Sequence, residues 1–290
     1  MIEVGPNAYG KSAIRLVKVV RSETPHRVRD LTVGIALEGD FAASYDAGDN
    51  AAVIATDTMK NTVYALAGEH LTGSIESFGT VLGRHFLAEP QVGLARVSIE
   101  EHAWQSIGSA PDAFRRDASS TRTAVVAVTR DGVAIDAGIA GLIVMKTTRS
   151  AFEGFPRDRF TTLKETDDRI MATKVTASWR YLPGEIDFDA SYDAIRSTLL
   201  EVFADHHSVS VQASIWIVGK AVLERHPEVA EISMSLPNLH HWTVDLSPFG
   251  IENDREVYVS TTEPHGLIEA TIRRAPTAES RPTLEHPPQP

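Results

Sequence analysis

Hydrophobic and polar positions alternate strictly along RDLTVGIALEGD, residues 29–40. This period of two predicts a strand with one buried face, and SAIRLVKVVR, residues 12–21, predicts its partner. Helical spacing then takes over, with one helix beginning near residue 56 and a second near Ser74. Two extended stretches follow, GLARVSIEEHAWQSI and TRTAVVAVTRDG. The first half is therefore predicted to run strand, strand, helix, helix, strand, strand.

The second half repeats this order of elements. VAIDAGIAGLIVMKTT and IMATKVTASWRYL predict two strands, and ASYDAIRSTLLEVFADHH predicts an amphipathic helix. A further helix, with a buried stripe from Val211 to Val222, precedes three strand candidates, EISMSL, HHWTVDLS and REVYVSTT. We therefore predict two modules, 1–132 and 133–275, and a proline-rich, disordered tail at 276–290. Long antiparallel sheets with helix pairs on one face leave strand edges exposed, which oligomerisation commonly covers.

Composition narrows the possible functions. Thirty-nine acidic residues against 28 lysines and arginines give a formal charge of −11, which argues against nucleic acid or an acidic membrane as a partner. The chain has no cysteine, which excludes disulfides, thiolate metal sites and thiol nucleophiles. The sequence shows no secretory signal, no transmembrane-length apolar run and no peroxisomal tripeptide, so we expect a cytoplasmic location.

The stretch ATDTMKNTVY, residues 55–64, interrupts an apolar run with Thr56, Asp57 and Thr58. Such residues are favoured helix N-caps because their side chains accept hydrogen bonds from unpaired backbone N–H groups. Capping is the ordinary interpretation, and a hydroxyl held out for chemistry is the alternative. YGK at 9–11 is similarly read as a turn and a solvated lysine before a strand.

Residues 150–170, SAFEGFPRDRFTTLKETDDRI, combine aromatic rings with Arg169 in an otherwise polar segment. Packing of the rings on the sheet and an ion pair of Arg169 with the preceding aspartates are the ordinary interpretations. The functional alternative is an aromatic platform beside a bidentate donor, which suits a flat, anionic heterocycle.

Two later stretches also carry candidate ligand groups. HHSVSVQASIW places Val211 and Gln212 in the first turn of a helix, where free N–H groups favour a polar or anionic ligand. SLPNLHHW places Asn238 and His240 on the same side of an extended segment. The adjacent histidines have no third ligand at a familiar spacing, so the sequence predicts no metal site.

Taken in order, these motifs resemble the urate oxidase (uricase) family. The matching stretches are YGK, ATDTMKNTVY, VSIEEHAW, FEGFPRDRFTTLKETDDRI, SVQA, SLPNLHHW and PHGLIEATI, which together span about residues 7–275. The resemblance implies an α+β tunnelling fold (T-fold), with two tandem modules and antiparallel sheets that assemble into a tetrameric barrel. It also implies oxidation of urate by molecular oxygen, with no metal or other cofactor, at active sites between subunits of a homotetramer. The alternative within this fold class is a pterin- or purine-binding relative without oxidase activity.

The resemblance assigns a proton relay to three residues. Lys11 and Thr56 match the catalytic lysine and threonine, and His240 matches the histidine that completes the relay. Thr56 also matches a substrate-binding position, and the adjacent Asp57 matches one that helps to bind substrate from the neighbouring chain.

The resemblance assigns substrate contacts to five further residues. Phe152 matches the aromatic residue that stacks on the purine ring, and Arg169 and Gln212 match the pair that grips the urate edges. Val211 matches a position that offers its backbone. Asn238 matches one above the ring, near oxygen or water.

Overall fold

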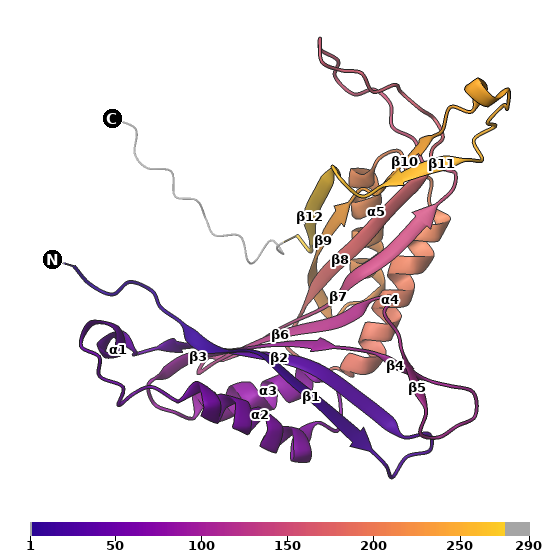
Figure 1. The fold of residues 1–290 in the computed structure, drawn as a ribbon. Helices are drawn as coiled ribbons and strands as arrows, with labels where there is room; N and C mark the ends of the chain where they lie inside the picture. Colours follow the sequence, from indigo (N-terminus) through magenta and orange to yellow (C-terminus); the bar gives the residue numbers. More distant parts are fainter. Residues whose placement is uncertain (1, 276–290) are drawn as a thin grey trace, which may run out of the picture.

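The structure, a computed structural model, describes residues 2–275. They form one eight-stranded antiparallel sheet with two pairs of long helices and two separate two-stranded hairpins (Figure 1). The strand order is β1-β2-β3-β6-β7-β8-β9-β12, so the first four strands come from the first half of the chain and the last four from the second. The predicted tail at 276–290 lies outside the described residues.

The first half follows the predicted order of strands and helices. It has two additions. A one-turn helix, α1, follows the second strand, and a hairpin, β4–β5, is inserted between the third and fourth strands of the sheet. Its elements are β1 (Tyr9–Val20), β2 (Arg27–Gly39), α1 (Ala42–Asp46), α2 (Thr56–His70), α3 (Ile75–Leu87), β3 (Val92–Glu101), β4 (Trp104–Ser106), β5 (Phe114–Arg116) and β6 (Thr121–Thr129).

The second half repeats this plan, again with a hairpin, β10–β11, inserted between the last two strands of the sheet. The strand candidates HHWTVDLS and REVYVSTT form this separate hairpin, and β12 is the strand that completes the sheet. The elements are β7 (Gly132–Lys146), β8 (Met171–Tyr181), α4 (Phe188–Asp205), α5 (Val211–Arg225), β9 (Val229–Pro237), β10 (His240–Thr243), a 3-10 turn η1 (Ser247–Phe249), β11 (Tyr258–Thr261) and β12 (Leu267–Arg273).

One predicted detail needs correction. The stretch 93–107 is not one strand: β3 ends at Glu101, where the backbone N–H of His102 bonds to Asp30 O, and β4 belongs to a hairpin. The sheet also runs without interruption across the predicted module boundary at 132/133, because β6 and β7 are hydrogen-bonded neighbours. The division into modules at that point stays a prediction, although each half has its own cluster of buried hydrophobic side chains.

The first strand of each half carries a bulge in its pairing with the next strand of the sheet. In β1 the register shifts between Lys11 and Ile14, and in β7 between Ile139 and Leu142. Both bulges contain a residue with positive φ, Ala13 at 55° and Gly141 at 78°. A bulge bends its strand and redirects neighbouring side chains. The repeat of element order is therefore accompanied by a repeat of backbone detail, and Lys11 lies directly before one bulge.

Candidate active site

The YGK stretch lies inside β1 rather than in a turn before it. Gly10 approaches β2 so closely that a Cβ at this position would lie 1.8 Å from Ile35 O, which explains the need for glycine. The Tyr9 hydroxyl accepts a hydrogen bond from the backbone N–H of Ile54 at 2.8 Å. Since Ile54 lies two residues before the first residue of α2, this bond joins the Lys11 segment to the Thr56 segment.

The predicted capping of α2 by Thr56, Asp57 or Thr58 is wrong. The N-cap is Ala55, whose methyl side chain accepts no hydrogen bond, and Thr56 is the first helical residue. Asp57 instead accepts hydrogen bonds from the Lys60 ammonium and the Asn61 amide. The Lys60 ammonium, with a smaller contribution from Lys11, holds the pKa of Asp57 below its usual value. The Thr56 hydroxyl is therefore not committed to capping its own helix.

Four of the predicted site residues meet in an open cleft of about 610 Å³ in the second half. Phe152 and Arg169 come from the long β7–β8 connection, while Asn238 and His240 come from the turn into β10. In Figure 1 these two segments rise together from the end of the second-half sheet. Residues more than 80 positions apart in sequence are thus brought to one site by the hydrogen-bonded strands beneath them.

Arg169 does not form the ion pair that its aspartate neighbours suggested. Asp168 accepts hydrogen bonds from the Thr148 hydroxyl and the Arg149 backbone, each at 2.8 Å. Among residues 2–275, the buried Nε of Arg169 has no hydrogen-bond partner. Burial lowers the pKa of this guanidinium, which still remains charged as arginine does in proteins.

The Arg169 guanidinium carbon lies 5.2 Å from the centre of the Phe152 ring. Phe155 stacks on the same Phe152 ring, with 5.0 Å between the ring centroids. Phe152 itself is fixed by two backbone hydrogen bonds with Thr166. An unpaired cation held beside an aromatic plate in a cleft can bind a planar, acceptor-rich anion.

Backbone bonds on both sides fix the Asn238–His240 turn. The N–H of Asn238 donates to Gly266 O, and the N–H of Leu239 donates to Ala172 O, each at 2.8 Å. The His240 ring stacks on Trp242, with 5.4 Å between centroids and 23° between planes. Burial, followed by the charge of Arg169, lowers the pKa of His240, so the neutral ring that can accept a proton is favoured.

Sequence reasoning missed Trp242, which lines the cleft and orients His240 by stacking. The signal was present, because a period of two along HHWT places Trp242 on the same face of the strand as His240.

Val211 and Gln212 open α5, as predicted. Ser210 is the N-cap, and its side chain accepts from the backbone N–H of Ala213 at 3.1 Å. In the part of the chain that the structure describes, neither Val211 nor Gln212 lines the cleft of Arg169. They are nevertheless linked to the segment that carries Phe152. Ser208, shortly before α5, accepts at its backbone oxygen from the Ala151 N–H at 2.7 Å, and Ala151 directly precedes Phe152.

The predicted site residues thus fall into two groups. Lys11, Thr56 and Asp57 belong to β1 and α2 of the first half, and the others belong to the second half, in the other arm of the molecule (Figure 1). The charge of Lys11 acts on Asp57, which shows that the first group is local. A site that uses both groups would draw them from two copies of the chain.

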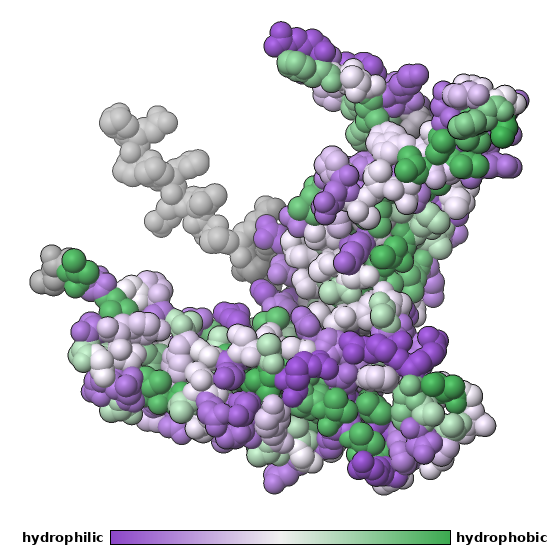
Figure 2. All heavy atoms as spheres, viewed as in Figure 1, coloured by the Kyte–Doolittle hydropathy of each residue, from purple (hydrophilic) through white to green (hydrophobic). Residues whose placement is uncertain are grey.

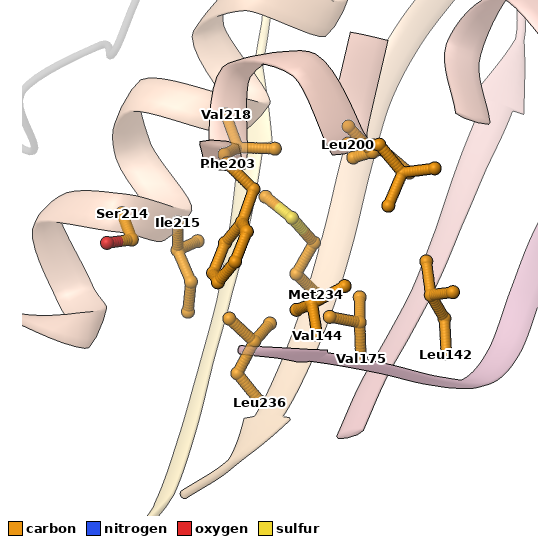
Figure 3. A pocket seen from close by; sticks show the side chains of 11 residues that line it. Leu142, Val144, Val175, Leu200, Phe203, Ser214, Ile215, Val218, Met234 and Leu236 are labelled. Atoms are coloured by element: carbon orange, nitrogen blue, oxygen red, sulfur yellow. The ribbon is translucent and has the colours of Figure 1, made fainter. Parts of the chain in front are cut away.

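A small apolar pocket between α4, α5 and the second-half sheet is a poor candidate for a purine site (Figure 3). Its volume is about 30 Å³, which corresponds to roughly one water molecule. Ser214 is its only polar lining residue among those described, and Figure 3 shows the hydroxyl pointing away from the apolar side chains.

Among residues 2–275, no three His, Asp or Glu side chains are placed to hold a metal ion. Within the same range, no helix is both long and apolar enough to cross a membrane.

Comparison with known proteins decides the family. The model of the family described as Uricase matches residues 7–127 and 135–269. The uricase of Arthrobacter globiformis is 49% identical over 274 residues, covering 94% of this chain and 90% of that protein. The chain belongs to the uricase family. The uricase of Dictyostelium discoideum is 38% identical over 277 residues, covering 93% of this chain and 96% of that protein.

Solved structures of the family agree with the fold. The crystal structure of the Arthrobacter globiformis uricase superposes with a TM-score of 0.92 at 48% identity, covering 99% of this chain and 98% of that one. A uricase from Bacillus fastidious has a TM-score of 0.79 at 24% identity, covering 92% of this chain and 93% of that one. The predicted α+β T-fold is therefore confirmed. Family membership does not favour the pterin- or purine-binding alternative without oxidase activity.

Proposed function

We propose that the chain is a urate oxidase, an oxidoreductase that converts urate, oxygen and water to 5-hydroxyisourate and hydrogen peroxide without a metal or organic cofactor. The observation that carries the proposal is the unpaired guanidinium of Arg169 beside the Phe152 ring, in a chain of the uricase family. Urate is planar, anionic near neutral pH and rich in hydrogen-bonding groups. Its negative charge can pair with the Arg169 guanidinium, and its flat ring can stack on Phe152.

The same residues give the site its selectivity. Phe152 covers one face of the purine, Arg169 pairs with its oxygen and nitrogen edge, and Gln212 with the Val211 backbone binds the opposite edge. Each buried polar group left unpaired would cost about 1–3 kcal/mol, so aromatic ligands without matching donors and acceptors bind weakly. Asp57 from a neighbouring copy completes the rim of the site.

Lys11, Thr56 and His240 form the proton relay. Lys11 draws a proton from urate through the Thr56 hydroxyl, and His240 with water completes the path. Deprotonated urate is electron-rich enough to reduce oxygen, which sits over the ring near Asn238. Carbon 5 then carries a peroxide, whose loss as hydrogen peroxide leaves an oxidised ring that adds water to give 5-hydroxyisourate. Urate supplies two electrons and oxygen accepts them, so the reaction balances without another reductant.

Assembly as a homotetramer is part of the proposal because the two residue groups lie in different halves of the chain. The edge strands β1 and β12 leave backbone groups available for pairing, and they carry Val17 and Leu267, which are 59% and 57% exposed. Figure 2 shows hydrophobic side chains at the surface of the second half as well, and Ile143 and Met145 of β7 are 63% and 53% exposed. Pairing between copies would cover these edges and bring the two groups together.

The test is aerobic incubation of the protein with urate in excess chelator, following urate absorbance, oxygen uptake and peroxide together. We expect equimolar loss of urate and oxygen with one equivalent of peroxide. Activity that disappears with chelator, or urate loss without oxygen uptake, contradicts the proposal.

A further inference from the structure

The segment that joins α4 to α5 contains hydrogen-bonded side chains that the proposed chemistry does not use. The Ser208 and Ser214 side chains are buried, with residue exposures of 0% and 1%, and their hydroxyl oxygens lie 2.8 Å apart. His206 Nε2 lies 2.8 Å from Ser214 Oγ. We refer to Ser208, Ser214 and His206 as the serine–histidine chain. Buried polar groups are costly unless they are satisfied, and satisfied networks make the local structure rigid.

The direction of the hydrogen bonds in this chain follows from its far end. His206 Nδ1 lies 2.7 Å from Val202 O, and a carbonyl oxygen only accepts, so Nδ1 carries the hydrogen. In the neutral ring Nε2 is then an acceptor, so the Ser214 hydroxyl donates to it and the Ser208 hydroxyl donates to Ser214. Ser210 O lies 3.1 and 3.2 Å from the same two hydroxyls, but each hydroxyl has a single hydrogen, so this carbonyl competes for it and does not accept in the same arrangement.

The histidine end of the serine–histidine chain is held by a buried lysine. Lys146, the last residue of β7, donates from Nζ to Phe203 O at 3.2 Å, to Ala204 O at 3.4 Å and to His206 O. These carbonyls close the C-terminal end of α4, where a positive charge is favoured by the helix dipole. His206 therefore sits on backbone that the sheet itself fixes.

The serine end is the junction between the pieces of the proposed urate site. Ser208 bonds through its backbone to Arg149 O at 2.9 Å and accepts from Ala151 N at 2.7 Å. Between Arg149 and Ala151, the carbonyl oxygen of Ser150 accepts a hydrogen bond from the Arg169 backbone N–H at 2.8 Å. One short segment is thus bonded to the backbones that carry Phe152 and Arg169, and it leads directly into α5.

We propose that the serine–histidine chain is a positioning element of the urate site, an inference that rests on the function proposed above. It holds the first turn of α5, and with it Val211 and Gln212, in a fixed position relative to Phe152 and Arg169. Ser214 acts from within α5 and touches no substrate. Its hydroxyl joins the start of α5 to the end of α4, beside the Ser208 segment that is hydrogen-bonded to the backbone leading into Phe152.

The test compares Ser214→Ala with a matched control, Thr198→Ala. Thr198 is also buried on this helix pair, and its hydroxyl lies 2.9 Å from His226 Nε2, a hydroxyl–histidine pair away from the segment that joins the helices to the site. We measure the melting temperature, the affinity for the unreactive purine dione xanthine by calorimetry, and KM and kcat for urate. Both variants should lose similar thermal stability. Only Ser214→Ala should raise the xanthine Kd and the urate KM, by about 5- to 10-fold, the effect of losing one hydrogen bond.

Two further variants keep the test decisive if Ser214→Ala folds poorly. Ser214→Thr retains the hydroxyl and adds one methyl group beside the small apolar pocket that Ser214 lines, so its affinity should return to within about twofold of wild type. His206→Asn keeps a donor near Val202 O but cannot reach Ser214, and should weaken xanthine binding as Ser214→Ala does.

Three results are informative. Equal xanthine affinity in Ser214→Ala and Thr198→Ala overturns the positioning role while leaving the proposed function intact. Selective weakening in Ser214→Ala, with recovery in Ser214→Thr, supports it. A wild-type protein that neither oxidises urate nor binds xanthine overturns both proposals.

Discussion

The two helix starts that carry predicted site residues, those of α2 and α5, are built in opposite ways. At α5 the N-cap Ser210 accepts from Ala213, and Ser208, Ser214 and His206 tie the first turn to its surroundings. At α2 the N-cap is Ala55, which has no polar side chain to offer, although three good capping residues follow it directly. The comparison shows that residue type alone does not determine capping. A shift of one residue along the chain changes which backbone N–H groups a side chain can reach.

This difference agrees with a division of roles between the two halves. The start of α5 follows Ser208, whose backbone is hydrogen-bonded to the segment that leads into Phe152. The start of α2 leaves the Thr56 hydroxyl uncommitted to its own helix, next to the strand that carries Lys11. On this account the second half supplies most of the urate contacts, and the first half supplies Lys11 and Thr56, two of the three relay residues.

The largest expected effect comes from removing the relay in the first half. Lys11→Met and Thr56→Ala should each lower kcat by about 10²-fold or more, the usual range for acid–base groups, with little change in xanthine affinity. Steady-state kinetics and calorimetry measure the two quantities separately. Thr58→Ala, an exposed threonine in the same helical turn, is the matched control and should leave both unchanged. Near-normal turnover of both relay variants would remove the first half from the chemistry.

Arg169→Ala should instead act mainly on binding. Losing hydrogen bonds to a charged group weakens xanthine binding by about 10- to 10²-fold, with a corresponding rise in the urate KM. Arg159→Ala is the control, because Arg159 stacks on exposed Phe160 in the same connection. If Arg169→Ala lowered kcat while xanthine affinity stayed normal, the division of roles between the halves would be wrong.

The two helix starts should also respond oppositely to mutation of their N-caps. Ala55→Ser adds the missing acceptor and should stabilise the fold by about 1 kcal/mol, whereas Ser210→Ala removes one and should destabilise it by about the same amount. Urea unfolding monitored by circular dichroism measures both. Destabilisation by Ala55→Ser would indicate that the α2 start has no room for a side-chain cap.

The smallest expected effect is the loss of folding stability at acidic pH. Burial lowers the pKa of His206, His226 and His240 in the second half and of His102 in the first. The unfolded chain binds these protons near pH 6.5, so the stability they contribute is present above that pH and is lost as the pH falls below it. Hydrogen exchange at pH 7 and 5.5 should therefore show α4 and α5 losing protection before α2 and α3. Uniform loss would contradict this asymmetry.

Much of the fold follows from the sequence. Period-two and helical patterns dominate both halves, and strictly alternating strands such as β2 and β8 are placed with their buried faces as predicted. The two inserted hairpins were not separated from the sheet, because short strands such as β4 and β10 carry the same alternation as long ones. Whether a strand joins a sheet depends on partners distant in sequence.

The site is less readable from local pattern. Local preferences favoured an ion pair for Arg169 and capping for Thr56, and both are wrong. Asp168 accepts from Thr148 instead, and Thr56 is already the first helical residue because Ala55 is the N-cap. Only the order of whole motifs along the chain grouped these residues into one site. Their division between two copies is a matter of assembly, which no local pattern encodes.

The most direct test of the account is complementation between two defective variants, Lys11→Met and Arg169→Ala, co-assembled and assayed at low urate concentration. If each site combines the first half of one copy with the second half of another, random assembly leaves about a quarter of the sites intact, and about a quarter of wild-type activity returns. Mixing Phe152→Ala with Arg169→Ala, both in the second half, should restore none. Failure of the Lys11→Met and Arg169→Ala mixture to exceed its separate components, in tetramers shown to contain both, would contradict the shared site.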